Sequence, residues 1–263
     1  MGYIYYFTMR LRTVVKYKTD TIFRIIRALI SFFTQIYLWK ALYGSNQVVA
    51  GVTIAEMMTY VVVSRFIGSV TSIRLSRDIE DRVKSGEIAT DLIRPMDIRL
   101  LFASRSIGDS LASLLLDGIP VILFCIIYLG GIMAPATIQH FALFLVSTVM
   151  AIIVNISLEL LIGTMAFWYM NAGKLNMFVY SLSALFSGGV VPLWFLPSWL
   201  GSIAYALPLQ AIKFIPLQIY LGRVSIAGSI ESIAVQAAWA LGLMLIQSLL
   251  WSKILKKIVL FGG

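Results

Sequence analysis

Long apolar runs, separated by short polar stretches, restrict the fold of this chain more than any other feature. Of its 263 residues, 60% are hydrophobic and only 13% are charged. Soluble domains rarely exceed about half apolar content, whereas a helix of about 20 apolar residues crosses a bilayer. We therefore predict an all-α polytopic membrane protein with a single transmembrane domain over residues 1–263. Six spans are expected, at residues 25–43, 53–74, 106–133, 141–169, 177–191 and 233–254.

The distribution of positive charge predicts how the spans are oriented. Of the 21 Lys and Arg residues, 17 lie before the first span, around the polar segment that follows the second span, near Lys174 or at the C-terminal end. By the positive-inside rule these regions, including both termini, face the cytoplasm. Aromatic and basic side chains over residues 3–20 predict an amphipathic helix in the cytoplasmic interface. Topology thus explains the net charge of +9, and no nucleic-acid partner is expected.

The most polar stretch, residues 76–99, lies between the second and third spans. It holds five basic residues and six of the 12 acidic residues, so it has to face water. Ile79 and Val83 are four residues apart, Gly86 is placed to end a helix and Pro95 to stop the next one. We predict two short amphipathic helices that form a docking surface for a soluble partner. The alternative is a solvated loop that rests on the lipid headgroups.

A second unusual stretch, residues 187–216, is apolar but contains four prolines. Proline interrupts a helix, so this stretch is expected to form short re-entrant helices on the outer side rather than one span. They would act as an outer gate or as a static packing element. The gate candidates are Pro192, Trp194, Phe195, Pro197 and Trp199.

Three ionisable residues within the predicted spans, Arg65, Asp117 and Glu159, are candidates for a pathway or for a structural ion pair. We expect Arg65 to pair with Glu159 or Asp117, because an unpaired charge in the membrane is costly. With one cysteine and one histidine, the chain offers neither a catalytic constellation nor a metal site. It also has no G-x-x-x-x-G-K-[ST] loop, so ATP hydrolysis by this chain is not expected.

Two motifs give a family resemblance. GEIATDLIRP, residues 86–95, and FSGGVVPLWFLPSWLGSIAYALP, residues 186–208, resemble sequences of type-2 permeases of ATP-binding-cassette (ABC) transporters, especially the small six-span bacterial exporters. The resemblance implies a permease subunit in the bacterial plasma membrane that works as a homo- or heterodimer. Two copies of a separate ATPase, which binds ATP and magnesium, would drive it.

In that family the ATPase docks on a coupling helix between spans two and three, with a smaller contact expected near Lys174. The implied coupling residues here are Asp78, Ile79, Arg82, Val83, Glu87, Ile88, Asp91, Leu92 and Arg94.

Two other functions stay open from the sequence. In an ion-coupled secondary transporter, Arg65, Asp117 and Glu159 would form an ion or proton relay, although the internal repeat typical of such proteins is absent. In a membrane scaffold or sensor, the central segment would recruit a soluble partner without transport. The apolar spans favour an amphiphilic cargo but do not identify it.

Overall fold

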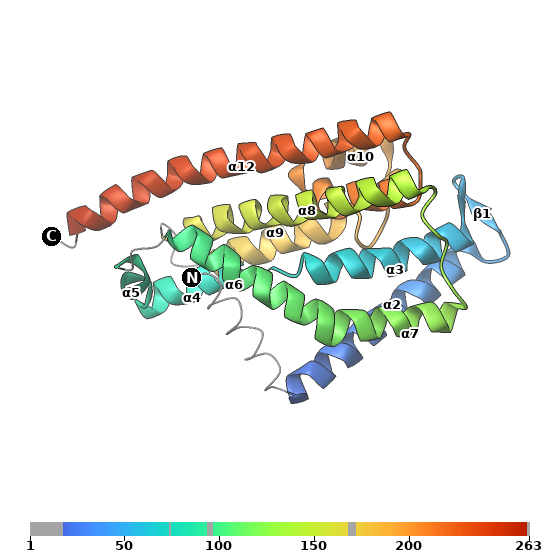
Figure 1. Cartoon of the computed structure of the whole chain (residues 1–263), viewed down its shortest axis with the longest axis horizontal. Coiled ribbons are helices and arrows are strands. Elements are labelled where there is room, and N and C mark those ends of the chain that lie inside the picture. The colour runs from blue at the N-terminus through green and yellow to red at the C-terminus, as the bar shows by residue number, and fades with distance from the viewer. Residues whose placement is uncertain (1–17, 74, 94–96, 168–171, 262–263) are drawn as a thin grey trace.

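A computed structural model describes residues 18–73, 75–93, 97–167 and 172–261 of the chain (Figure 1). Long helices run back and forth between two ends of the molecule. They are α2 (Lys18–Tyr43), α3 (Ile54–Val70), α6 (Ile98–Ser113) continued by the π-helix η1 (Leu114–Gly118) and α7 (Ile119–Leu129), α8 (Ile138–Met165), α9 (Ala172–Phe186) and α12 (Ile226–Phe261).

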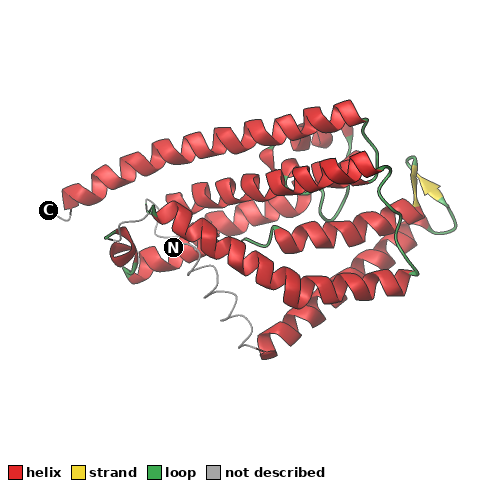
Figure 2. Cartoon of the chain, viewed as in Figure 1, coloured by secondary structure: helices red, strands yellow, loops and turns green. Residues whose placement is uncertain are grey.

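Shorter elements connect the long helices. Strands β1 (Val48–Val49) and β2 (Val52–Thr53) form an antiparallel hairpin between α2 and α3. Between α3 and α6 lie α4 (Leu75–Ser85) and α5 (Ile88–Leu92), and between α9 and α12 lie η2 (Leu193–Phe195), α10 (Ser198–Ala206), η3 (Pro208–Ala211) and α11 (Phe214–Tyr220). Helices dominate the described chain (Figure 2), which agrees with the predicted all-α class.

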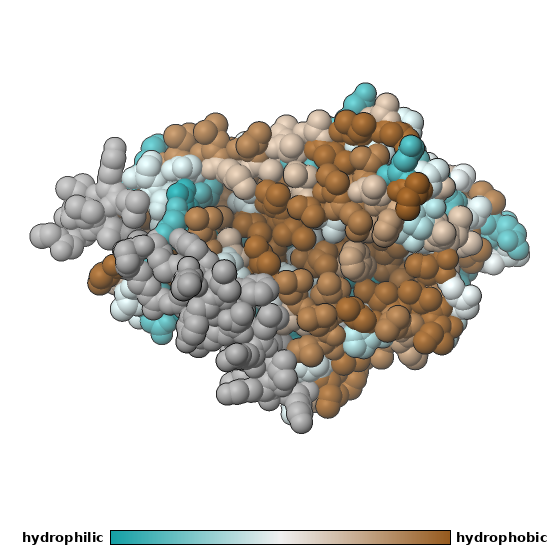
Figure 3. Space-filling view, viewed as in Figure 1, coloured by the Kyte–Doolittle hydropathy of each residue, from teal (hydrophilic) through white to brown (hydrophobic). Residues whose placement is uncertain are grey.

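Within the described ranges, four helices are long and apolar enough to cross a membrane. They are Thr21–Tyr43, Ile98–Leu129, Ile138–Met165 and Ile226–Ile254. Hydrophobic surface covers the middle of the molecule, and hydrophilic atoms gather toward its two ends (Figure 3). At 17 and 15 residues, α3 and α9 are shorter than a usual span. A multi-pass membrane protein is therefore shown, and the count of six spans stays a prediction.

The helix expected at residues 106–133 starts earlier, at Ile98, and its course changes at η1 (Figure 1). The Asp97 side chain caps its first turn by accepting from the Arg99 amide at 2.8 Å. Pro120 follows η1 and has no N–H to offer the Leu116 carbonyl, so a regular α-helix cannot continue through it. The π-turn accommodates this loss and redirects α7.

Helices α8 and α12 lie side by side and form the largest interface in the fold (Figure 1). Two buried glutamines of α12 reach across it. Gln236 accepts from the Ser147 hydroxyl at 2.9 Å and donates to the Ala211 carbonyl at 2.7 Å, while Gln247 donates to Thr164 at 3.3 Å. Buried polar side chains in a membrane helix need such partners, and these bonds fix the register of the two helices.

The Pro-rich stretch forms four short helices, as its prolines suggested, and whether they enter the membrane stays a prediction. The interfacial helix predicted at residues 3–20 lies almost entirely outside the described residues.

A partner surface at one end and a cationic cavity between helices

Helix α4 is held at its first turn by side chains from two other helices. Glu159 of α8 accepts from the Ser76 amide at 3.0 Å and from the Ser76 hydroxyl. The Asn176 amide of α9 donates to the same hydroxyl at 2.8 Å. The first amides of a helix have no partner within it, so the Glu159 carboxylate acts as a cap supplied from outside. The beginning of α4 is thereby tied to α8 and α9 together.

A glycine lets α4 cross α8 at short range. A Cβ built on Gly163 would lie 2.7 Å from Cδ1 of Ile79 and 3.2 Å from Cα of Ser76. A side chain at this position would therefore force Ile79 and the backbone at Ser76 to shift, so the close crossing favours glycine.

The predicted pair of short helices is present, with the break at Gly86, which has a φ of 77°. Their apolar face, however, points into the chain. Ile79 is 3% exposed and Ile88 9%, and they pack with Phe102 and other residues of α6, α8 and α12. This apolar stripe therefore anchors the segment to the membrane domain, with Val83 half-buried against the same cluster, and contact of Ile79, Val83 and Ile88 with the ATPase stays a prediction.

Ion pairs hold α5 on α4. The Arg82 guanidinium lies 2.5 Å from the Asp91 carboxylate, whose side chain is fully buried, and 3.7 Å from Glu87. Burial takes Asp91 out of the surface available to a partner, contrary to expectation. Asp78 is half-buried. The Leu92 side chain and Arg94 lie outside the described residues.

The opposite face of the two helices is exposed and polar. On α4 the exposed residues recur at the spacing of one helical face. Further exposed residues lie directly before α5, within it and directly after it. Together these exposed residues are Arg77, Asp81, Lys84, Ser85, Glu87, Ala89, Thr90 and Ile93. We call these residues the partner surface. It lies at the end of the molecule where α12 also ends (Figure 1).

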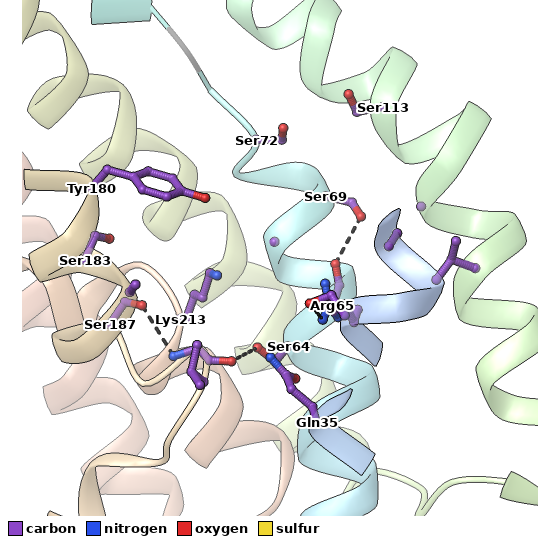
Figure 4. A pocket seen from close by; sticks show the side chains of 18 residues that line it. Gln35, Ser64, Arg65, Ser69, Ser72, Ser113, Tyr180, Ser183, Ser187 and Lys213 are labelled. Atoms are coloured by element: carbon purple, nitrogen blue, oxygen red, sulfur yellow. Dashed lines mark hydrogen bonds between the residues drawn. The ribbon is translucent and has the colours of Figure 1, made fainter. Parts of the chain in front are cut away.

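The second feature is a cavity of about 360 Å³ between α2, α3, α6 to α7 and α9 (Figure 4). Small and polar residues line it at helical spacing. The lining includes Ser31 and Gln35 of α2, Arg65, Gly68, Ser69 and Ser72 from α3 and the link after it, and Tyr180, Ser183 and Ser187 from α9 and its end. This polar stripe of α3 is visible in the sequence as residues at i, i+3, i+4 and i+7, a signal that the search for charged residues overlooked.

Two cations share this cavity. Arg65 of α3 donates to the Ser31 hydroxyl. Lys213, in the stretch predicted to lie on the outer side, enters from the segment before α11 (Figure 4). Its Nζ would lie 2.8 Å from a Cβ on Gly189, so this glycine leaves the space that the ammonium occupies, and 3.8 Å from a Cβ on Gly68, an ordinary contact.

The expected pair between Arg65 and Glu159 is wrong. Glu159 lies at the start of α4, where it binds Ser76, and Arg65 binds Ser31. The predicted second span extends to residue 74, but α3 ends at Val70, so Arg65 lies roughly 7 to 8 Å from the end of its helix. The alternative partner, the Asp117 side chain, lies outside the described residues.

The gate candidates divide into two groups. Trp194 packs between Tyr60 and Phe214, with ring centroids 5.5 and 5.1 Å apart, and the Arg223 guanidinium lies 5.4 Å from its ring. Phe195 packs on Trp39 at 5.2 Å, and Pro192 is buried. Pro197 and Trp199 are exposed. Packing explains the first group, and a gate stays a prediction.

Together, the apolar helices, the anchored polar helices at one end and the polar cavity between helices define a membrane-embedded transport component. The chain belongs to the ABC-2 family of transporter proteins, whose model matches residues 3–261. The comparison with curated proteins gave no match. The match confirms the resemblance to type-2 ABC permeases. It makes the chain a membrane component of an ABC transporter and implies association with an ABC ATPase.

Proposed function

We propose that this protein is the permease subunit of an ABC exporter in the bacterial plasma membrane, with both termini in the cytoplasm. Two permease subunits, identical or homologous, form the translocation pathway, and two ATPase subunits bind beneath them. ATP and magnesium bind to the ATPase. The proposal rests on the family match together with one structural observation: the partner surface is displayed on helices whose inner side is bonded to α8 and α9.

This arrangement suits the transmission of force. The exposed residues of α4 and α5 contact the ATPase. Ile79, Ile88 and the hydrogen bonds of Ser76 transmit its displacement to the spans. Binding of ATP favours the closed ATPase pair, which shifts the permease toward a state open to the outside. Hydrolysis then returns the complex to its resting state.

The first experiment tests ATPase binding. The tagged protein is expressed with its neighbouring genes, extracted in mild detergent, and the retained proteins are identified. We expect the wild type to retain an ABC ATPase and the double variant Asp81→Lys/Glu87→Lys to lose it, because two exposed acids on the partner surface change sign. Glu231→Lys, an exposed acid near the start of α12 at the other end of the molecule, is the matched control.

Retention of the ATPase by the double variant would remove α4 and α5 from the docking interface. If the wild type retained no ATPase in its native membrane, the proposed function itself would be rejected. Size-exclusion profiles of all variants show whether the permease remains folded.

A further inference from the structure

The cavity carries two positive charges and a lining of hydroxyl groups, and no acidic residue is present among the lining side chains that the structure describes. Within the described part of the chain, Lys213 forms neither a hydrogen bond nor an ion pair, and the hydrogen bond of Arg65 goes to the neutral Ser31. Helix α4 differs, because its cations Arg82 and Lys84 both have carboxylate partners.

Two cations in one cavity repel each other, and the local backbone positions both of them there. Gly189 makes room for the side chain of Lys213, and the Gly189 carbonyl is fixed by the Ser64 hydroxyl at 3.1 Å. Arg65 leaves α3 one turn before Gly68, over which the ammonium lies. An anion that enters this space would relieve the repulsion and gain charge-assisted hydrogen bonds from both side chains.

We propose that this cavity binds the anionic group, a phosphate or carboxylate, of an amphiphilic cargo. The proposal rests on the proposed transport function and specifies its class of substrate. A divalent or monovalent anion fits the charges, and the hydroxyl of Ser183 adds a donor of the kind that phosphate and carboxylate oxygens accept.

The rim of the cavity explains why the cargo is amphiphilic. Tyr180 lines the cavity and is 77% exposed, and Met177, one turn earlier on α9, is 74% exposed. A ligand whose anionic group reaches Lys213 therefore leaves the cavity over an apolar surface of α9. An alkyl chain is accommodated there, whereas a small hydrophilic anion gains nothing from it.

The test measures binding of radiolabelled dodecyl phosphate to the purified protein in nanodiscs of phosphatidylcholine. The zwitterionic dodecylphosphocholine and inorganic phosphate serve as competitors. We expect dodecyl phosphate to bind and neither competitor to displace it efficiently. Lys213→Gln and Arg65→Gln should each weaken binding roughly tenfold or more, the effect of losing a charged hydrogen-bond partner. Lys40→Gln, which removes a cation stacked on Tyr37 and Tyr128 outside the cavity, should change it less than about twofold.

A further variant separates binding from folding. Ser183→Glu places a carboxylate in the cavity, where it would pair with the cations. We expect this variant to bind dodecyl phosphate poorly and to unfold at a higher temperature than the wild type, a combination that misfolding cannot produce. Equal binding by the wild type and Lys213→Gln, or equal binding of dodecyl phosphate and dodecylphosphocholine, would overturn the proposal.

Phosphatidylglycerol in the nanodiscs distinguishes two sources of the anion. If it displaces dodecyl phosphate, the cavity recognises an anionic bilayer lipid; if it does not, the cavity recognises an anionic cargo other than this lipid. Both results support an anion site. ATPase copurification is measured on the same samples, so that loss of the ATPase with Lys213-dependent binding intact would reject the transport function alone.

Discussion

The partner end of the molecule and the cavity use charge in opposite ways. At the partner end, Arg82 and Lys84 are paired with carboxylates, and Gly163 brings two helices into contact. In the cavity, Arg65 and Lys213 share a space without a described acid, and Gly189 leaves room for the Lys213 side chain. Paired charges and close packing suit a part that transmits force. Unpaired charges and open space suit a part that receives a ligand.

The largest effect is expected at the crossing of α4 and α8. Gly163→Leu would force a side chain against Ile79 and the backbone at Ser76, and we expect it to cost about 2 to 3 kcal/mol of stability. ATPase retention should fall with it. Gly242→Leu on α12 is the control, since nothing lies within 4 Å of its Cβ. Thermal unfolding in detergent and copurification measure both effects. Equal stability of the two variants would show that α4 does not need its close approach.

A pair of substitutions tests the contrast in charge. Arg82→Met removes the guanidinium from the buried Asp91 carboxylate and should destabilise the protein by about 2 kcal/mol. Lys213→Met removes a cation that is repelled by Arg65, so it should be neutral or stabilise by up to about 1 kcal/mol. The unfolding temperature should therefore fall for Arg82→Met and stay the same or rise for Lys213→Met. A similar decrease for both would mean that Lys213 has a protein partner.

The start of α6 offers the smallest effect and a dependence on pH. The hydrogen bond from Arg99 lowers the pKa of Asp97, so the folded state holds this proton less tightly than the unfolded state does. The resulting stability is present above about pH 4, the ordinary pKa of aspartate, and is lost as the pH falls below it. Asp97→Ala should cost about 1 kcal/mol at pH 7, and Asp97→Asn less, because asparagine retains the cap. Equal losses for both at pH 7 would assign the effect to the ion pair instead.

Local features of the fold could be predicted from the sequence, because they depend on neighbouring residues. The break at Gly86 and the short helices of the Pro-rich stretch follow from backbone preferences that act within a few residues. The direction in which the apolar face of α4 points could not be predicted. Ile79 suits a soluble partner and the membrane domain equally well, and only the position of α8 decides between them.

The cavity depends on residues that are far apart in the chain, and its discovery needed the structure. Depth along a span can be counted, but the sequence does not show which neighbour a side chain faces, so it predicts Glu159 or Asp117 as the partner of Arg65 and does not point to Ser31. Lys213 is 148 positions after Arg65, in the stretch predicted to lie on the outer side. The polar stripe of α3 is the available sequence signal, since polar residues repeated on one face of a membrane helix indicate a polar environment.

The hydroxyl of Ser76 has one proton, which it donates to Glu159, so the Asn176 amide has to supply the proton of the second bond. The hydrogen bonds therefore run in one direction, from α9 through α4 to α8. Asn176, Tyr180 and Ser183 follow one another at i, i+4 and i+7, which places this contact and the cavity wall on one stripe of α9. If α4 shifts by the length of a single hydrogen bond, α9 either moves with it, which reshapes the cavity wall, or loses its hydrogen bond to Ser76, which releases the wall from α4. In either case a displacement of α4 at the partner end would change the cavity through the hydrogen bonds of Ser76.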